Sequence, residues 1–338
     1  MRKMIVEALN QDSDIKVVGT GKDGQEILRR TIELKPDCIT LDLEMPKMDG
    51  LETLRYIMGE WPTPVVILSA HSAKGAKLTL QCLECGAVDF VAKTQKGNRF
   101  PAEELVARVK IAATADVTKV RFNAPEQSIR IEEKRGLSTL VESVVVIGAS
   151  TGGPQALMEI IPKLPEDLPA CVIVIQHMPP NFTGYLAERL DSRSRLIVRE
   201  AESGNQFLPG HVLVAPGGKH FFLEERLGRP TVMLLDRNEL QRTACPSIDF
   251  AMTSMSSVFK ERLVGVILTG MGRDGAAGSR SIRRFGGTIL CQDFETSMIF
   301  GMPAAVIDEG FADEICPLQE VAHCIVRNVD EISSKAVQ

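Results

Sequence analysis

Three residues whose side chains together form a nucleophilic site follow three apolar segments in the second half of this chain. Ser150 stands in G-A-S-T-G, His177 directly follows C-V-I-V-I-Q, and Asp274 lies in G-M-G-R-D-G, a turn after V-G-V-I-L-T. A histidine can take the serine proton, and a carboxylate can fix the histidine tautomer and stabilise the imidazolium. These residue types therefore predict a serine catalytic triad.

The apolar segments predict strands of a doubly wound, parallel α/β sheet of the Rossmann-like kind. The run V-V-V-I before Gly148 is rich in β-branched residues, and Pro154 suits the first turn of a following helix. The carboxyl ends of such strands meet at one edge of the sheet, where the three side chains would converge. We expect the backbone N–H groups of Thr151 and Met271 to form the oxyanion hole there.

Other residues could fill the same roles. His220, in A-P-G-G-K-H, is an alternative base, and Asp249 and Asp293 are alternative acids. None of them directly follows a strongly apolar segment, so we rank them lower. His177 could instead cap a strand end, and Asp274 could cap the helix predicted over A-A-G-S-R-S-I-R-R. The order serine, histidine, aspartate along the chain disfavours the α/β-hydrolase, trypsin and subtilisin families.

Six motifs in register resemble the catalytic domain of bacterial chemotaxis protein-glutamate methylesterases. They are I-G-A-S-T-G-G-P, I-Q-H-M-P-P-N-F-T, V-L-V-A-P-G-G-K-H, C-P-S-I-D, I-L-T-G-M-G-R-D-G-A-A-G and F-G-M-P. The resemblance covers residues 141–332 and implies that Ser150, His177 and Asp274 are the catalytic triad. It also implies hydrolysis of glutamate γ-methyl esters and deamidation of glutamines on methyl-accepting chemoreceptors, with no cofactor for catalysis.

The first part of the chain carries a second set of polar residues at the ends of predicted strands. Asp42 ends D-C-I-T-L-D, Ser69 follows P-V-V-I-L, and Lys93 follows V-D-F-V-A. A carboxylate, a hydroxyl and an ammonium group at one sheet edge suit an aspartyl phosphate, although Ser69 could cap a helix and Lys93 could be a solvated strand end. With D-x-x-M-P-x-x-D-G, residues 1–114 resemble a flavodoxin-like two-component receiver domain. The resemblance implies that Asp42 is the phosphoacceptor, Ser69 the switch hydroxyl and Lys93 the phosphate-binding lysine, with a chemotaxis histidine kinase as phosphodonor.

This receiver domain is predicted to be incomplete. A receiver begins with an apolar central strand that ends in two acidic residues, but this sequence opens with M-R-K-M-I-V-E-A-L, which predicts a helix. Of the carboxylates that would hold Mg²⁺ for phosphorylation, Asp42 alone remains. We expect the magnesium site to be incomplete and attribute the missing strand to a start codon assigned too far downstream, with a degenerate domain as the alternative.

Composition and charge are those of two globular domains joined by a linker. The chain has 338 residues, and residues 115–140 are charged and lack sustained apolar periodicity, which predicts the linker. The net charge of −5 and the lack of a dense basic stretch disfavour nucleic acid as a partner. No apolar run approaches the length of a membrane span, and no charged leader precedes one, so we expect a cytoplasmic protein without membrane insertion.

The eight cysteines are expected to be reduced. Cys82 and Cys85 share one face of a predicted helix, and no second pair completes a zinc site.

Two other functions for the second domain remain open. A nucleotide-binding output domain could use G-A-S-T-G-G as a phosphate loop, but the sequence lacks the G-x-G-x-x-G spacing and the P-loop lysine. A non-catalytic interaction module with a vestigial triad is the other alternative. Labelling of Ser150 by an active-site serine probe would distinguish both from an esterase.

Overall fold

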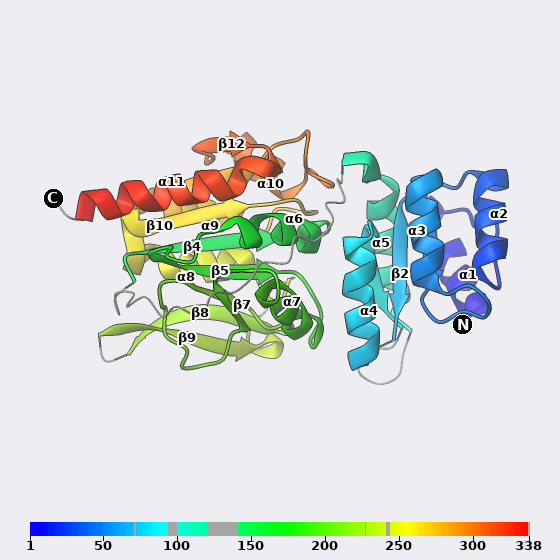
Figure 1. Ribbon diagram of the computed structural model, residues 1–338, viewed down its shortest axis with the longest axis horizontal. Coiled ribbons are helices and arrows are strands. Elements are labelled where there is room, and N and C mark those ends of the chain that lie inside the picture. Colours follow the sequence, from blue (N-terminus) through cyan, green and yellow to red (C-terminus); the bar gives the residue numbers. More distant parts are fainter. Residues whose placement is uncertain (71, 94–99, 120–140, 227, 241–243, 337–338) are drawn as a thin grey trace. The chain divides into compact units, whose positions relative to one another are not determined.

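The computed structural model describes the whole chain except residues 71, 94–99, 120–140, 227, 241–243 and 337–338. The chain divides into two compact units, Met1–Asn123 and Ala124–Gln338 (Figure 1). Most of the predicted linker, residues 120–140, lies outside the described residues, and its bounds stay a prediction. Both units are α/β domains built on parallel sheets, which confirms the predicted fold class.

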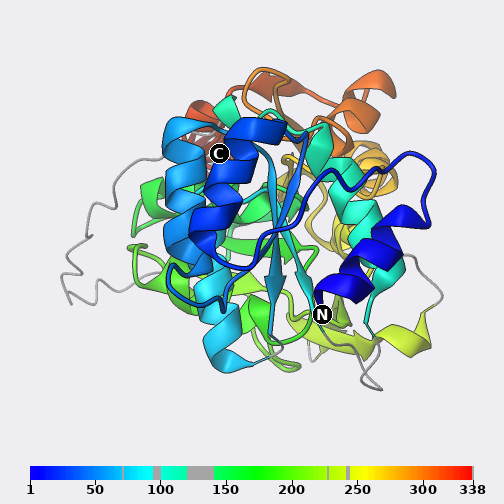
Figure 2. The same cartoon turned by 90° about the vertical axis from the view of Figure 1, so that its right-hand side faces the viewer.

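The first unit has a three-stranded parallel sheet in the order β1-β2-β3. Figure 2 shows α1 and α5 on one side of this sheet and α2, α3 and α4 on the other. The elements are α1 Arg2–Asn10, α2 Gly24–Leu34, β1 Ile39–Asp42, α3 Gly50–Glu60, β2 Val65–Ser69, α4 Ala73–Glu84, β3 Asp89–Ala92, α5 Ala102–Ala113 and the 3-10 helix η1 Val117–Lys119.

The three strands of this small sheet are buried to different degrees. Every residue of β2 and β3 is buried, whereas Leu41 is the one fully buried residue of β1. Within the described residues β1 pairs with β2 alone, and the apolar segment around Val18 forms no strand. The side chain of Val18 is 49% exposed. Asp42 therefore ends a strand that is the edge of the described sheet.

The second unit contains a seven-stranded parallel sheet in the order β12-β11-β10-β4-β5-β7-β6, and an antiparallel hairpin of β8 and β9. Its strands are β4 Ser143–Ala149, β5 Ala170–Gln176, β6 Ile197–Glu200, β7 His211–Val214, β8 Lys219–Arg226, β9 Arg229–Asp236, β10 Leu263–Ile267, β11 Thr288–Gln292 and β12 Glu314–Cys316. Its helices are α6 Gly153–Ile160, α7 Phe182–Asp191, α8 Ile248–Phe259, α9 Ala276–Arg284, α10 Met302–Asp308 and α11 Leu318–Ala336, with the 3-10 turns η2 Ile161–Lys163, η3 Arg237–Glu239 and η4 Lys260–Arg262.

The strand order of the large sheet reverses between β4 and β10. The chain builds outward from β4 through β5 and then returns to add β10 on the opposite side of β4. Doubly wound sheets place their ligand sites outside the carboxyl ends of the strands at such a switch point. The predicted triad residues follow β4, β5 and β10, the three strands at this point.

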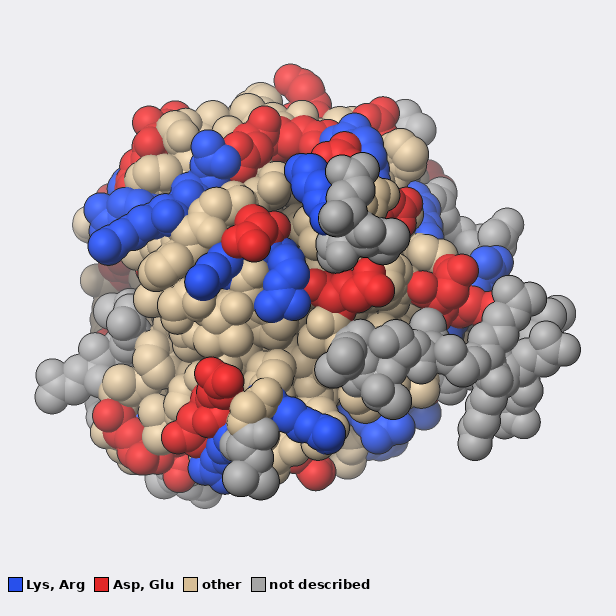
Figure 3. Space-filling view, turned by 90° about the vertical axis from the view of Figure 1, so that its left-hand side faces the viewer, with Lys and Arg blue, Asp and Glu red and all other residues tan. Residues whose placement is uncertain are grey.

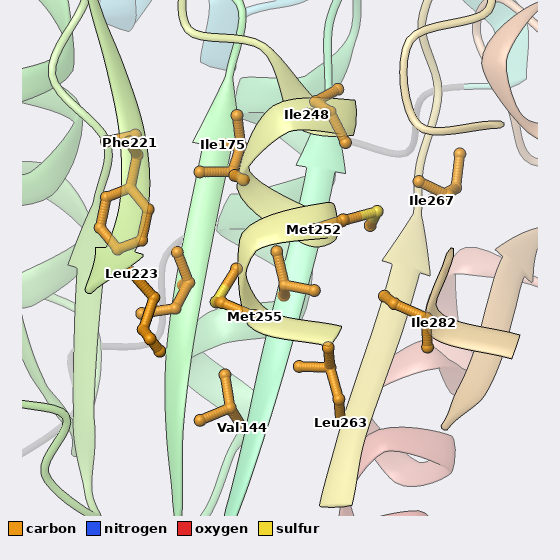
Figure 4. Packing of buried hydrophobic residues seen from close by; sticks show 14 of the residues in the cluster. Val144, Ile175, Phe221, Leu223, Ile248, Met252, Met255, Leu263, Ile267 and Ile282 are labelled. Carbon is orange, nitrogen blue, oxygen red and sulfur yellow. The ribbon is translucent and has the colours of Figure 1, made fainter. Parts of the chain in front are cut away.

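Helix α8 covers this part of the sheet and reaches the carboxyl ends of its strands. Figure 4 shows Met252 and Met255 of α8 facing the strands, with Ile248 at the start of the helix. A Cβ atom at Gly148 would lie 2.6 Å from the Cγ2 atom of Ile248, so a glycine is required for this close approach. Burial of each large apolar side chain stabilises the fold by roughly 1.5–3 kcal/mol, which fixes the helix start against the end of β4.

One face of the molecule is mixed in charge (Figure 3). On the face in Figure 3, acidic and basic side chains are interspersed. Of the helices in the described part of the chain, none combines the length and apolar character that a bilayer crossing requires. All eight cysteines are free thiols, as predicted.

Candidate active site

Ser150 directly follows β4 in a turn whose backbone is held on both sides. Its N–H donates to the Thr269 carbonyl at 3.1 Å, and its own carbonyl accepts from the N–H of Gly153 at 2.8 Å. Gly152 has φ +78°, the left-handed conformation that favours glycine. The Ser150 side chain is 7% exposed. The turn therefore presents the hydroxyl at the end of a central strand, before the start of α6.

His177 and Asp274 are brought together from opposite sides of β4. His177 follows β5, and its N–H continues the pairing with β4 by donating to the Ala149 carbonyl at 3.0 Å. Its Nε2 atom lies 2.8 Å from the Oδ2 atom of Asp274. Within the described residues, no hydrogen bond joins the Ser150 hydroxyl to His177. Because Nε2 is engaged by Asp274, the ring nitrogen left for the serine proton is Nδ1.

The start of α8 holds the carboxylate of Asp274. The N–H of Ile248 donates to Oδ2 at 2.8 Å and that of Asp249 to Oδ1 at 2.9 Å, while the Ser247 hydroxyl lies 3.2 Å from Oδ1. Burial by itself raises the pKa of Asp274, but the hydrogen bond and charge of His177 and these backbone donors outweigh it and lower the pKa below its usual value. Asp274 is therefore held as a carboxylate facing His177.

Asp249 performs the matching role for the next helix. Its Oδ1 atom accepts from the N–H groups of Gly275 at 2.8 Å and Gly278 at 2.7 Å, at the start of α9. The alternative in which Asp274 caps this helix is thus wrong, because Asp274 is turned toward α8 and His177. Burial, together with the charge of Asp274, raises the pKa of Asp249.

The remaining alternative residues lie in other surroundings. His220 is fully buried in β8 and packs edge-on against Phe250, with ring centroids 5.9 Å apart. Asp293 accepts from the N–H of Thr296 at 2.9 Å and from its hydroxyl at 2.6 Å, which stabilises a turn after β11. Of the candidate acids, Asp274 is the one hydrogen-bonded to His177.

The predicted oxyanion donors lie on the two turns nearest the serine. Thr151 is buried, and its carbonyl accepts from the Thr269 hydroxyl at 3.0 Å. A Cβ atom at Gly270 would lie 2.7 Å from the Ser150 Cβ atom, so the turn that carries Met271 passes directly beside the serine. The Met271 N–H has no hydrogen-bond partner among the described residues. An oxyanion hole formed by these two N–H groups stays a prediction.

The receiver residues are brought together in part. The Nζ atom of Lys93 lies 2.6 Å from the Oδ1 atom of Asp42. Ser69 is fully buried, and its hydroxyl accepts from the Thr79 hydroxyl at 2.6 Å. Lys93 and Asp42 thus contact each other, whereas the Ser69 hydroxyl is engaged by α4. The phosphate-binding roles of Ser69 and Lys93 stay a prediction.

The described carboxylates of the first unit do not fit a magnesium ion. Mg²⁺ in phosphoryl-transfer sites is held by carboxylates and waters in octahedral geometry. Here Asp42 is the one carboxylate predicted for the ion, and its Oδ1 atom already accepts from Lys93 and from the Glu44 N–H at 3.0 Å. In the described parts of both units, no group of three or more acidic, histidine or cysteine side chains could hold a metal.

The sequence analysis missed two residues that support this site. Ser247 is the N-cap of α8 and also contacts Asp274, and Gln176 directly precedes His177. A serine before an apolar helix is a recognisable capping signal. A polar residue that ends an otherwise apolar, buried strand is a signal of the same kind, and it marks Gln176.

Comparison with known proteins identifies a family for each of the two units. The family model for the CheB methylesterase matches residues 145–325, and that for the response regulator receiver domain matches residues 1–110. The protein-glutamate methylesterase/protein-glutamine glutaminase of Symbiobacterium thermophilum is 46% identical, covering 98% of this chain and 94% of the relative. A protein of the same name from Thermotoga maritima is 39% identical, covering 97% and 95%.

One solved structure adds to the comparison of the second unit. The crystal structure of the Thermotoga maritima CheB methylesterase catalytic domain is 43% identical, with a TM-score of 0.52, and the match covers 55% of this chain and 97% of that one. The family models and the relatives, which match over nearly the whole chain, lead to one conclusion. This chain belongs to the CheB methylesterase family and carries an amino-terminal response regulator receiver domain.

Proposed function

We propose that this chain is a protein-glutamate methylesterase that also deamidates protein glutamines, with Ser150 as nucleophile, His177 as base and Asp274 as the acid that orients it. The observation that carries the proposal is the 2.8 Å contact of His177 Nε2 with Asp274, at the end of the strand that pairs with the Ser150 strand. The substrates are glutamate γ-methyl esters and certain glutamines of proteins, as the names of the relatives suggest. We assign them to methyl-accepting chemoreceptors, as the resemblance to the chemotaxis methylesterases implies.

The chemistry begins with the serine hydroxyl. Its oxygen attacks the ester carbonyl carbon while its proton passes to Nδ1 of His177, because the Nε2 proton is donated to Asp274. The carboxylate of Asp274 stabilises the imidazolium that forms. Its lowered pKa keeps it ionised for this task.

Collapse of the tetrahedral intermediate then releases the leaving group. The imidazolium of His177 protonates methanol from an ester, or ammonia from an amide, and an acyl group remains on Ser150. A water molecule activated by His177 hydrolyses this acyl-enzyme. We assign the negative oxygen of the two tetrahedral states to the N–H groups of Thr151 and Met271.

The receiver domain is the proposed regulator. Asp42 is its phosphoacceptor, Ser69 its switch hydroxyl and Lys93 its phosphate-binding lysine, with a chemotaxis histidine kinase as the phosphodonor and the cytoplasm as the location. Receivers use Mg²⁺ for this phosphorylation, and a single carboxylate with waters is a weak ligand set for that ion. We therefore expect the chain of this sequence to have esterase activity that does not respond to phosphodonor.

A serine-directed probe tests the catalytic assignment. A fluorophosphonate should label Ser150, and the labelling should disappear in His177→Ala, since the base activates the hydroxyl. A nucleotide-binding or non-catalytic output domain would give no such dependence. Because a bulky probe can fit a shallow cleft poorly, methanol release from methylated chemoreceptor is measured in parallel. Absence of methanol release from the folded wild-type chain would overturn the proposal.

A further inference from the structure

Gln176 occupies a position between the two strand ends that carry Ser150 and His177. It is the last residue of β5, and its side chain is 1% exposed. Its Nε2 atom donates to the Ser150 carbonyl at 2.8 Å and lies 3.3 Å from the carbonyl of His177. One amide group therefore contacts the main chain of both proposed catalytic residues.

This contact begins where the regular strand pairing ends. The last paired residues of β4 and β5 are Ala149 and Gln176. One further backbone bond, from the His177 N–H to the Ala149 carbonyl, follows them; after it one chain turns into α6 and the other continues into M-P-P-N, and the backbone ladder stops. The two N–H bonds of the Gln176 amide take the place of the next ladder hydrogen bonds.

The far end of the amide is also fixed. A Cβ atom at Gly153 would lie 2.0 Å from the Oε1 atom of Gln176, so this glycine makes room for the amide. The Oε1 atom is buried without a hydrogen-bond partner in the described structure. A buried acceptor left unsatisfied costs free energy, and an apolar side chain of the same length would avoid that cost. The amide at this position is therefore engaged through its donor end and not through its acceptor end.

The hydrogen bond from the Gln176 amide constrains the backbone from which the Ser150 side chain extends. The Ser150 carbonyl accepts from both Gln176 and the N–H of Gly153, which fixes the peptide plane that follows the serine. Fixing that plane and the carbonyl of His177 together sets how the hydroxyl and the imidazole face each other. Reacting groups must be held to within a fraction of an ångström for efficient proton transfer.

We infer that Gln176 is a positioning residue of the esterase, whose side-chain amide holds the Ser150 turn and His177 in the geometry for proton transfer. The inference rests on the proposed function, because it assumes that Ser150 and His177 react. It assigns no contact between Gln176 and the substrate.

The test replaces the amide by an apolar group of similar length in the full chain. For Gln176→Met we expect kcat for methanol release from methylated chemoreceptor to fall by about 10- to 100-fold, because a displacement of about 1 Å can cost as much as 100-fold in rate. KM should stay within about twofold, since the substrate is not contacted, and the rate of fluorophosphonate labelling should fall with kcat. The melting temperature should stay within about 5 °C of that of the wild type, because the loss of the two amide hydrogen bonds is offset by removal of the unsatisfied oxygen.

A second variant and a control complete the design. Gln176→Asn keeps an amide that is one methylene shorter and cannot reach both carbonyls, so it should show the same loss of kcat. It provides the test if the methionine variant does not fold. Gln319→Met, in the first turn of α11, should leave kcat unchanged.

The possible outcomes separate this inference from the proposed function. Unchanged kcat in a folded Gln176 variant, or a raised KM with kcat retained, would overturn the positioning role while the wild-type activity stands. Wild-type protein that releases no methanol would overturn the proposed function itself. A loss of kcat at constant KM, with the melting temperature retained, supports the inference.

Discussion

The two units place polar residues at the carboxyl ends of parallel strands, but they surround them differently. Strand β4 lies between β10 and β5, and all seven of its residues are buried. Strand β1 is the edge of the described three-stranded sheet, and the Asp42 side chain at its end is 30% exposed. A residue at the end of a central strand can contact side chains from the neighbouring strands on both sides. A residue at the end of an edge strand can contact those from one side.

The consequence is visible in the partners of the two carboxylates. Asp274 is held by two backbone N–H groups, a hydroxyl and an imidazole, drawn from α8 and the end of β5. Asp42 is held by Lys93 and by the N–H of Glu44, two positions further along its own turn. A charged group at the end of a buried strand needs such partners, and the seven-stranded sheet provides more of them than the described three-stranded sheet does. The comparison predicts a fully assembled site in the second unit and a partial one in the first.

The largest effect is expected from removal of the proposed nucleophile. Ser150→Ala removes the nucleophile, and we expect methanol release from methylated receptor to fall by about four orders of magnitude or more, with the fold retained. His177→Ala should do nearly the same. Ser192→Ala, an exposed serine of the same unit, serves as the control and should keep full activity. Wild-type turnover in purified Ser150→Ala would refute the assignment.

A smaller loss should follow when the orienting acid is changed. Asp274→Asn keeps the size of the side chain but weakens the stabilisation of the imidazolium, so kcat should fall by up to about four orders of magnitude, less than in Ser150→Ala. The measurement is the same methanol-release assay, with Asp308→Asn on α10 as the control. If Asp274→Asn turned over at the wild-type rate, Asp249 or Asp293 would have to be the acid.

The unequal burial of the two sheets should be measurable without any substrate. We expect backbone amides of β1 to exchange with deuterium about 100-fold faster than those of β4, because edge strands open more easily than central ones. Hydrogen-exchange mass spectrometry on the full chain compares the two segments in one sample. Equal protection of both strands would mean that β1 is covered as well as β4.

A modest effect on stability is expected at the second acid of the catalytic unit. The pKa of Asp249 is raised in the folded protein. The free energy of unfolding therefore falls as the pH rises from the unfolded pKa of this carboxyl through its folded pKa. Asp249→Asn removes that loss and should therefore raise the free energy of unfolding more at neutral pH than at a pH below 3.8, the ordinary pKa of this carboxyl. Urea unfolding at the two pH values measures this. An equal change at both would show that the Asp249 carboxyl titrates as in the unfolded chain.

The smallest expected effect is in the receiver. Addition of a small phosphodonor with Mg²⁺ should change the esterase rate of this chain by less than about twofold, because Asp42 offers the ion a single carboxylate. Asp42→Asn, treated identically, supplies the baseline. Clear Mg²⁺-dependent stimulation of the unsubstituted chain, absent in Asp42→Asn, would mean that other acids, such as Glu44 or Asp49, complete the metal site.

The sequence was sufficient to predict the strands that carry the candidate site residues and the residue types at their ends. Long runs of β-branched residues define buried parallel strands with little ambiguity, and the ends of those strands specify which side chains meet. The strand predicted over 264–269 ends at Ile267 in the structure, because Thr269 bonds instead to the side chain of Gln292. Side-chain hydrogen bonds of this kind depend on distant residues, which the local pattern does not contain.

The same reason explains what the sequence could not show at the site. Asp274 precedes α9 in the chain, so local rules assign it to that helix, yet it binds the start of α8 and leaves α9 to Asp249. Each aspartate thus binds the start of the other helix, which requires α8 and α9 to begin side by side. The order of the strands in the sheet determines that placement. The bridging role of Gln176 is likewise invisible until β4 and β5 are adjacent.

The position of β10 in the sheet has a consequence for the protein during its synthesis. This strand comes late in the chain, 97 residues separate His177 from Asp274, and β10 pairs directly with β4. A nascent chain can form β4 and β5 while β10 is still within the ribosome, but the edge of β4 stays open and the histidine has no acid. The contact of His177 with Asp274 therefore forms at the step that closes this edge, and an incomplete translation product would present Ser150 and His177 without it.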